Sequence, residues 1–206
     1  MKPKKKITTF IFDIGNVILY FDHQVIVRKL SNLSGIPASE IYDDIFHHRF
    51  INQFEKGLIS EKTFYKKCLA KLKIKISFAE FAGIFSNIFT PNAPLFPVIR
   101  KLKTQGCRLC ILSNTDKTHF EYLSKRYPVM GLFNSYYLSY KLHCMKPETR
   151  IFKMLLKKEN VLPEECLYTD DISKYTDKAR RLGINSVHFK SAGQFTRELK
   201  KICTCI

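Results

Sequence analysis

The stretch of sequence that decides the fold is Phe10-Ile11-Phe12-Asp13-Ile14-Gly15-Asn16-Val17. It continues an apolar, β-favouring run that begins at Ile7, and this run ends in one acidic residue with a turn-forming Gly-Asn pair close behind. The pattern predicts a buried strand with Asp13 at its carboxyl end, which is where open α/β sheets carry their chemistry. Taken alone the aspartate decides little, because many strand-end aspartates only cap a loop.

Three later features give this aspartate a chemical context. The first is Ser113-Asn114, which follows a second apolar run. The second is Lys146, which precedes a proline, and the third is Asp170-Asp171, which follows a third apolar run. A nucleophilic carboxylate, a hydroxyl, a lysine and an acidic pair are the groups that Mg²⁺-assisted phosphoryl transfer through an aspartyl-phosphate uses.

The C-terminal half of the chain alternates predicted strands with predicted helices. The expected strands are 107–112, 133–138, 166–169 and 184–189, and the expected helices are 117–125, 148–157, one that ends at 182 before Gly183, and 194–202. Such alternation predicts an α/β fold, with a parallel sheet that helices cover on both faces.

Residues 22–91 break this rhythm, because their apolar residues recur at helical spacing. Ser77 and Glu80 form a capping-box pattern ahead of the apolar residues from Phe81 to Phe85. We therefore expect an all-helical cap, residues 22–91, inserted into a catalytic core of residues 1–21 and 92–206, where it would lie over the strand ends as a lid. Asp22 stands at the junction, and we interpret it as a hinge or helix N-cap residue.

Length and composition limit the class of protein. At 206 residues and 45% hydrophobic content, the chain can bury a full core. No apolar stretch reaches the length of a membrane span, and the basic start lacks a signal-peptide cleavage site, so we expect a cytoplasmic protein that does not enter a membrane. The seven cysteines are interpreted as reduced thiols, and Cys107 and Cys110 should point to opposite faces of one strand.

The net charge of +17 raises the question of nucleic-acid binding. The lysines are spread along predicted helices and turns, and no recognised nucleic-acid motif accompanies the one compact run, Lys4-Lys5-Lys6. We therefore expect no specific nucleic-acid site. The positive charge suits an anionic substrate such as a phosphate ester.

Four segments, in order, resemble the motifs of the haloacid dehalogenase-like hydrolases, and the resemblance spans nearly the whole chain. These segments are 13–17, 112–115, 146–148 and 169–171. The segments Phe54-Glu55-Lys56-Gly57-Leu58-Ile59-Ser60 and Met145-Lys146-Pro147-Glu148-Thr149-Arg150-Ile151-Phe152 are similar to the branch that holds bacterial α-D-glucose-1-phosphate phosphatase and the N-terminal phosphatase domain of soluble epoxide hydrolase. The resemblance implies a Rossmann-like three-layer α/β/α core with a parallel sheet and an inserted helical cap.

The resemblance also implies a role for each motif residue. Asp13 would attack phosphorus, Ser113 and the Asn114 region would bind the phosphoryl oxygens, and Lys146 would neutralise charge shared by the nucleophile and the phosphate. The implied Mg²⁺ ligands are Asp13, the main-chain carbonyl of Gly15, Asp171 and, directly or through water, Asp170. Two carboxylates and a carbonyl suit Mg²⁺, which keeps several of its waters.

Two residues depart from the usual pattern of the family. Gly15 stands where most phosphatases of the family carry a second aspartate, which protonates the leaving oxygen, although the branch resembled here also has glycine there. Loss of this acid should favour leaving groups of low pKa, with Asp22 as the first candidate for a replacement. Tyr175 stands where the branch usually has asparagine, and it could alter support of the metal ligands.

The resulting hypothesis is a Mg²⁺-dependent phosphatase that acts on a small phosphorylated metabolite, with a sugar phosphate such as glucose 1-phosphate favoured. His47, His48 and Arg49 in the cap could face that substrate, or lie on a solvated helix face. The alternatives are a catalytically impaired binding or regulatory protein, a 2-haloacid dehalogenase and a nucleic-acid binder. We expect a monomer or a homodimer.

Overall fold

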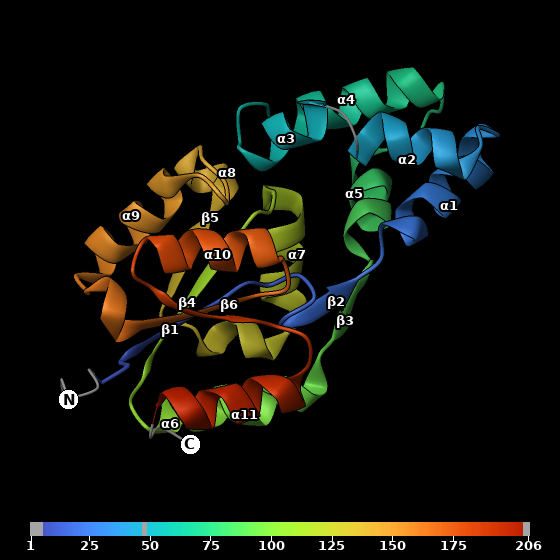
Figure 1. The fold of residues 1–206 in the computed structure, drawn as a ribbon. Coiled ribbons are helices and arrows are strands. Elements are labelled where there is room, and N and C mark those ends of the chain that lie inside the picture. The colour runs from blue at the N-terminus through green and yellow to red at the C-terminus, as the bar shows by residue number, and fades with distance from the viewer. Residues whose placement is uncertain (1–5, 47–48, 204–206) are drawn as a thin grey trace.

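The computed structural model describes residues 6–46 and 49–203 and contains one five-stranded sheet (Figure 1). The strands lie in the order β5 (Ser135–Leu138), β4 (Arg108–Ser113), β1 (Thr9–Phe12), β6 (Cys166–Asp170) and β7 (Asn185–His188). All four neighbouring pairs are parallel. The predicted α/β class with a parallel sheet is therefore confirmed.

Side chains of the central strand alternate between two apolar layers, as strand geometry requires. Phe10 and Phe12 pack with α6 (Phe96–Thr104), α7 (Lys117–Arg126) and α11 (Ala192–Ile202). Ile11 packs on the opposite face with α9 (Thr149–Glu159) and α10 (Ser173–Arg181). Figure 1 shows the sheet between these two helical layers, so the core has the predicted Rossmann-like three-layer architecture.

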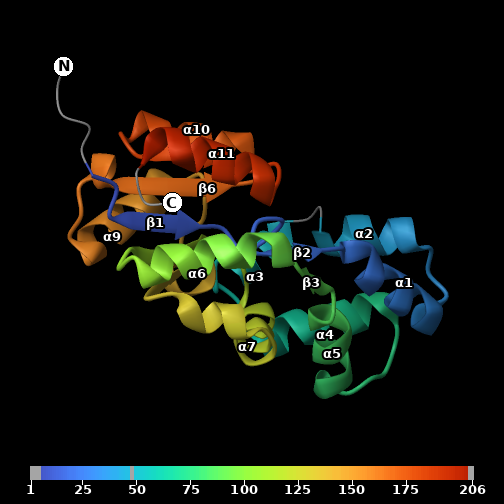
Figure 2. The ribbon, with the colours of Figure 1, turned by 90° about the horizontal axis from the view of Figure 1, so that it is seen from below.

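In the sequence of the described residues, a group of five helices lies between β1 and the other strands of the five-stranded sheet. These helices are α1 (His23–Ser34), α2 (Ala38–Phe46), α3 (Arg49–Glu55), α4 (Glu61–Leu72) and α5 (Phe78–Ser86). We call this group the helical insert. It encloses an apolar cluster of its own that includes Phe64, Phe81 and Phe85. It lies beyond the carboxyl ends of the strands (Figure 2). The division of the chain into separate domains at residues 22 and 91 stays a prediction.

The insert is joined to the core by a two-stranded antiparallel ribbon, β2 (Leu19–Phe21) and β3 (Phe89–Pro91). Sequence periodicity did not predict this ribbon, because strands of three residues carry too little alternation. Asp22 follows β2 directly and caps α1, since its side chain accepts a hydrogen bond from Gln24 N at 2.8 Å. The predicted N-cap role of Asp22 is therefore confirmed, as is the Ser77–Glu80 capping box.

Two further expectations concern cysteines and membranes. Cys110 is buried in the layer that contains α9, whereas Cys107 packs against the opposite layer, so the two side chains do point apart. The buried Cys68, Cys144 and Cys166 form no disulfide within the described part of the chain. None of the helices in residues 6–46 and 49–203 is long and apolar enough to cross a membrane.

Candidate active site

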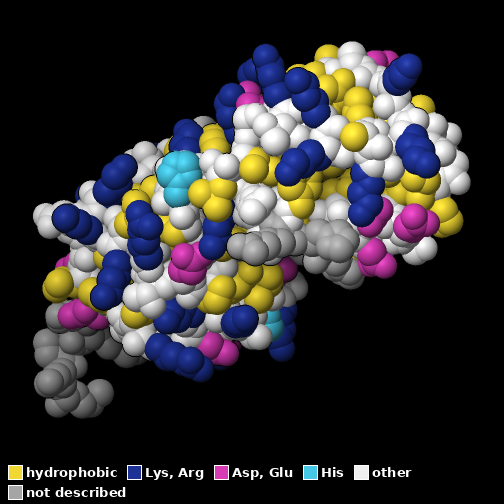
Figure 3. Space-filling view, turned by 90° about the horizontal axis from the view of Figure 1, so that it is seen from above, with side chains coloured by type: hydrophobic (Ala, Val, Ile, Leu, Met, Phe, Trp, Pro, Cys, Tyr) yellow, Lys and Arg dark blue, Asp and Glu magenta, His cyan; other side chains and the backbone are white. Residues whose placement is uncertain are grey.

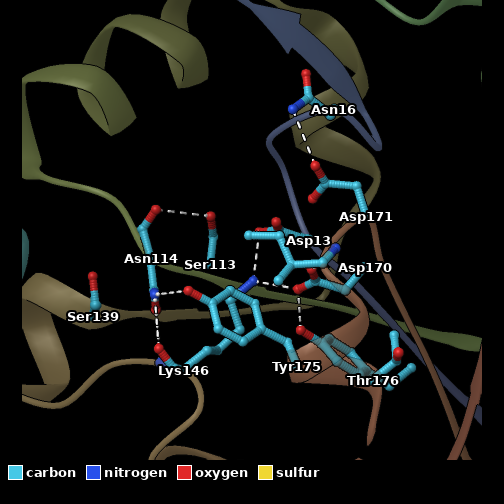
Figure 4. Close-up of polar contacts among 12 residues, drawn as sticks. Asp13, Asn16, Ser113, Asn114, Ser139, Lys146, Asp170, Asp171, Tyr175 and Thr176 are labelled. Carbon is cyan, nitrogen blue, oxygen red and sulfur yellow. Dashed lines mark hydrogen bonds and ion pairs between the residues drawn. The ribbon is translucent and has the colours of Figure 1, made fainter. Parts of the chain in front are cut away.

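The predicted site residues meet at the carboxyl edge of the sheet. Ser113 ends β4, Asp13 follows β1 and Asp170 ends β6, and these three strands are neighbours in the sheet. Asp13 is held in line with the next strand, because its main-chain N donates to Thr169 O at 3.0 Å. Figure 4 shows the side chains converging from these strand ends.

Lys146 connects two of the carboxylates. Its Nζ lies 2.9 Å from Asp13 Oδ1 and 2.6 Å from Asp170 Oδ2, and the side chain is buried. Burial alone would lower the pKa of Lys146, but the two carboxylates outweigh it and hold that pKa above its usual value. The lysine therefore carries a positive charge between the two acids.

The main chain of Lys146 is fixed by Asn114. Lys146 N donates to Asn114 Oδ1 at 2.8 Å, and Asn114 Nδ2 donates to Lys146 O at 3.0 Å (Figure 4). Because the oxygen and the nitrogen of the Asn114 side-chain amide both form hydrogen bonds with the main chain of Lys146, Asn114 positions the loop that carries this lysine. The hydroxyl of Ser113 makes only a weak contact, 3.4 Å to Asn114 O, at the buried end of β4.

Three carboxylates form an acidic triad, which we define as Asp13, Asp170 and Asp171. Each offers an oxygen that lies within 4.8 Å of an oxygen of the other two. Asp170 is fully buried and accepts hydrogen bonds from Tyr168 OH, Lys146 Nζ and Ile172 N. Asp171 accepts a hydrogen bond from Asn16 Nδ2 at 3.1 Å.

The electrostatics of the triad fit a divalent cation. Burial raises the pKa of Asp13 to about 7, although Lys146 acts in the opposite direction, and burial also raises the pKa of Asp171. Apart from its ion pair with Lys146, Asp13 Oδ1 has no hydrogen bond within the described residues, although it is buried. A buried carboxylate oxygen with spare capacity, beside two more carboxylates, matches the oxygen ligands that Mg²⁺ prefers.

Tyr175 lies against the lysine rather than within the triad. Its ring centroid is 5.1 Å from Lys146 Nζ, and its hydroxyl is 3.5 Å from Asn114 Nδ2. This geometry is that of a cation–π contact. The residue that replaces the usual asparagine therefore covers the Lys146 ammonium.

Gly15 leaves no room for a side chain. A Cβ added to Gly15 would lie 2.7 Å from Phe21 Cε1, and the Phe21 ring also packs against the rings of His23 and Phe89. Phe21 thus fills the space beside Gly15 into which a second acidic side chain would project. This packing could not be read from the sequence, because Phe21 belongs to the unpredicted ribbon.

A cavity of about 90 Å³ lies between the sheet edge and the helical insert. The core contributes Gly15, Ser113, Asn114, Thr115 and His119, and the insert contributes His23, Phe46, Ile51, Glu55 and Phe85. The insert therefore does lie over the strand ends, as predicted for a lid. Most of its side chains in the cavity wall are apolar or aromatic.

Sequence reasoning missed one carboxylate and two histidines in this wall, Glu55, His119 and His23. Glu55 ends α3 and lines the cavity. His119 is buried, with Nδ1 2.6 Å from Asp116 Oδ2 and Nε2 2.8 Å from Phe85 O. The only signal for Glu55 was its place in the segment 54–60, which carried part of the family resemblance.

The remaining candidates from the sequence are Asp22, His47, His48 and Arg49. Asp22 is about half exposed, pairs with Arg28 and does not line the cavity. His47 and His48 lie outside the described residues, and the side chain of Arg49 is not described either, so their contact with substrate stays a prediction. His23 is stacked on Phe46 in the cavity wall, and burial lowers the pKa of His23 to about 4.

The fold and the triad can be compared with known proteins. A family model described as a haloacid dehalogenase-like hydrolase matches residues 7–174. The chain belongs to this family. The resemblance inferred from the four motifs is therefore confirmed. The matched region of this hydrolase includes β1, the insert and the strands up to β6.

Two relatives match almost the full length of this hydrolase. D-ribitol-5-phosphate phosphatase of Bacteroides thetaiotaomicron is 25% identical over 95% of this chain and 98% of its own. A sesquiterpene phosphatase of Aspergillus oryzae is 24% identical over 96% of this chain and 99% of its own. A Bacteroides thetaiotaomicron enzyme of the family, solved in complex with magnesium and inorganic phosphate, shares the fold with a TM-score of 0.80, at 23% identity over 90% of this chain and 95% of that one.

Proposed function

We propose that this hydrolase is a Mg²⁺-dependent phosphatase that cleaves a small phosphorylated metabolite through an aspartyl-phosphate on Asp13. One observation carries the proposal: the buried Lys146 ammonium joins Asp13 to Asp170 beside a third carboxylate, Asp171. A lone lysine leaves this cluster with excess negative charge, which a divalent cation and a bound phosphoryl group together would organise.

Asp13 is the proposed nucleophile. Its carboxylate must be ionised to attack phosphorus, and burial, which raises the pKa of Asp13 to about 7, opposes that ionisation. A bound cation and Lys146 both favour the ionised form. Ser113 Oγ, the main chain of Asn114 and Lys146 are proposed to bind the phosphoryl oxygens, since they surround Asp13 at the strand ends.

Asp13, Asp171 and the carbonyl of Gly15 are proposed to hold Mg²⁺. Asp170 supports them, because Lys146, Tyr168 and Ile172 already occupy its two oxygens. The bound ion would supply a positive charge that stabilises the charge on the transferring phosphoryl group. The magnesium and phosphate in the related Bacteroides enzyme support this assignment.

The helical insert is proposed to act as a cap that meets the leaving group. The cavity lies between the insert and the strand ends, and its size suits a small leaving group. Relatives of full length are named for a sugar-alcohol phosphate and for sesquiterpenes, which supports a phosphate monoester substrate without fixing its leaving group. Glucose 1-phosphate remains a test substrate within this class.

Rival functions fit the structure less well. A dehalogenase needs no metal, so the acidic triad would have no purpose in one. A binding protein without turnover would have no need of the Asp13–Lys146–Asp170 ion-pair cluster. A specific nucleic-acid site would need concentrated positive charge. Figure 3, which views the molecule of Figure 1 from above, shows Lys and Arg scattered over that face with acidic and apolar side chains between them.

The proposal is tested by a screen of the purified protein with Mg²⁺ and with excess EDTA. The panel contains p-nitrophenyl phosphate, glucose 1-phosphate, ribitol 5-phosphate and a prenyl monophosphate. We expect Mg²⁺-dependent release of phosphate from at least one member. Full activity in EDTA would contradict the proposed metal, and no release from any phosphate monoester would contradict the proposed reaction.

A further inference from the structure

Among the described residues of the core, none offers an acidic side chain beside Gly15 to protonate a leaving group. The Phe21 ring fills the space beside Gly15, because a Cβ added to Gly15 would lie only 2.7 Å from Phe21 Cε1. Asp22, next in the chain, caps α1 and pairs with Arg28. An alkoxide is a poor leaving group, so hydrolysis of an alkyl phosphate needs an acid from elsewhere.

Among the described residues of the insert that line the cavity, Glu55 carries the carboxyl group. It faces the same cavity as Gly15, Ser113 and Asn114. The residue is partly buried and belongs to the wall of this cavity. No hydrogen bond from a described residue is among the influences on the pKa of its carboxyl group.

The main chain around Glu55 is attached firmly to the core. Ser139 Oγ lies 2.6 Å from Glu55 O, and Ser139 itself accepts a hydrogen bond from Thr115 N at 2.9 Å. This connection links the end of α3 directly to the loop that follows Ser113 and Asn114. The main chain of Glu55 is therefore held at a fixed place relative to the loop that follows Ser113 and Asn114.

The next two residues strengthen this attachment. Lys56 Nζ pairs with Glu148 at 2.8 Å, and His143 Nδ1 lies 3.0 Å from Lys56 O. Gly57 approaches Tyr140 O so closely that an added Cβ would be 2.2 Å from it. The core residues in these contacts lie on both sides of Lys146 in the sequence. The contacts therefore attach the insert to the same loop that carries this lysine.

The surroundings of Glu55 raise the pKa of its carboxyl group into the neutral range. Burial raises its pKa to about 7; Asp116 and Asp13 act in the same direction, whereas His119 and Lys146 oppose them. His23 is the other titratable group of the insert in this wall, and its lowered pKa leaves it neutral. A carboxylic acid that loses its proton near pH 7 has the pKa that suits a general acid and base in this range.

We propose that Glu55 is the proton donor for the leaving-group oxygen, a role that rests on the proposed phosphatase function. As Asp13 forms its bond to phosphorus, the bond from phosphorus to the leaving oxygen breaks, and that oxygen takes the proton of Glu55. The alcohol departs and Glu55 is left as a carboxylate. It then takes a proton from the water that attacks phosphorus, the bond to Asp13 breaks, and phosphate leaves with Glu55 protonated again.

The test compares Glu55→Gln with the wild type on two substrates. These are p-nitrophenyl phosphate, whose leaving group needs little protonation, and the primary alkyl phosphate that the wild type hydrolyses fastest. We expect kcat/KM on the alkyl phosphate to fall by about 10²- to 10⁴-fold, with a far smaller change on p-nitrophenyl phosphate. The retained activity also shows that the variant is folded. Equal losses on both substrates, or no loss on the alkyl phosphate, would overturn the assignment.

A pH profile and a control separate proton donation from docking of the insert. The ratio of wild-type to Glu55→Gln rates on the alkyl phosphate should fall as pH rises through about 7, since the wild-type acid is then lost. Glu61→Gln removes another contact between insert and core, the 2.9 Å pair with Lys117, outside the cavity. It should leave the substrate preference unchanged, and the same shift in preference there would refute the proposal. An inactive Asp13→Asn beside an unaffected Glu55→Gln would reject only the donor, whereas an active Asp13→Asn would reject the phosphatase mechanism itself.

Discussion

Phe21 packs its ring against Gly15 so closely that a Cβ on Gly15 would lie 2.7 Å from Phe21 Cε1. Gly15→Ala should therefore destabilise the protein by about 1–3 kcal/mol through overpacking. In a Phe21→Ala background the cost of Gly15→Ala should shrink, because the clash is gone. Denaturant unfolding of the four proteins measures this coupling. Gly131→Ala is the control, since an added Cβ there meets no atom within 4 Å. Additive costs at positions 15 and 21 would contradict the packing argument.

Asp171→Asn should weaken Mg²⁺ binding while leaving the fold intact. The amide is close to isosteric and can still accept the hydrogen bond from Asn16, but it removes one negative charge from the triad. We expect the Mg²⁺ concentration needed for half-maximal activity to rise by at least about tenfold. Asp177→Asn, at an exposed carboxylate that pairs with Arg180, is the matched control. A Mg²⁺ titration that coincides for wild type and Asp171→Asn would remove Asp171 from the metal site.

Tyr168→Phe should lower activity because Tyr168 OH donates to Asp170, which in turn bonds Lys146. Loss of such a supporting hydrogen bond typically costs about 10- to 100-fold in metal affinity or activity. Tyr137→Phe provides the comparison, since Tyr137 OH bonds Glu159 on the same face of the sheet away from the triad. We expect that variant to lose stability but to keep its kcat and its Mg²⁺ dependence. Similar kinetic losses in both variants would mean that Tyr168 acts only through stability.

His119 should make the stability of the protein depend on pH. Burial alone would lower the pKa of His119, but the Asp116 carboxylate at 2.6 Å and the Phe85 carbonyl outweigh it, so the pKa lies above 6.5. A raised folded-state pKa means that this stabilisation is complete below pH 6.5 and is lost as pH rises through the folded value. The difference in unfolding free energy between wild type and His119→Gln should therefore be largest near pH 6 and smaller at pH 9. A difference that grows with pH would show that His119 is neutral in the folded protein.

Much of the sheet and its acidic edge could be predicted from the sequence. Each apolar run that ends in Asp13, Ser113 or Asp170 marks its own strand end, and carboxyl ends of parallel strands meet at one edge. Lys146 joins this edge from a loop, where only the resemblance to a family indicated its role. Its contacts with two acids could not be derived from spacing.

Residues contributed by the insert could not be predicted in the same way. Glu55 of the insert and Phe21 of the adjoining ribbon reach the site only through tertiary packing, and no local pattern encodes that packing. The α6 helix was missed because Pro97 lies in its first turn, where a proline is tolerated but disguises the start of a helix. The ribbon of β2 and β3 was missed because each strand has only three residues.

The most direct test of the central claim is the Mg²⁺-dependent turnover of p-nitrophenyl phosphate by Asp13→Asn, with unfolding measured in parallel. The amide preserves the size of the side chain at the end of β1 but cannot form an acyl phosphate. We predict a folded protein whose phosphate release is lost to the background of the uncatalysed reaction. Turnover close to that of the wild type would contradict the proposal that Asp13 forms the aspartyl-phosphate.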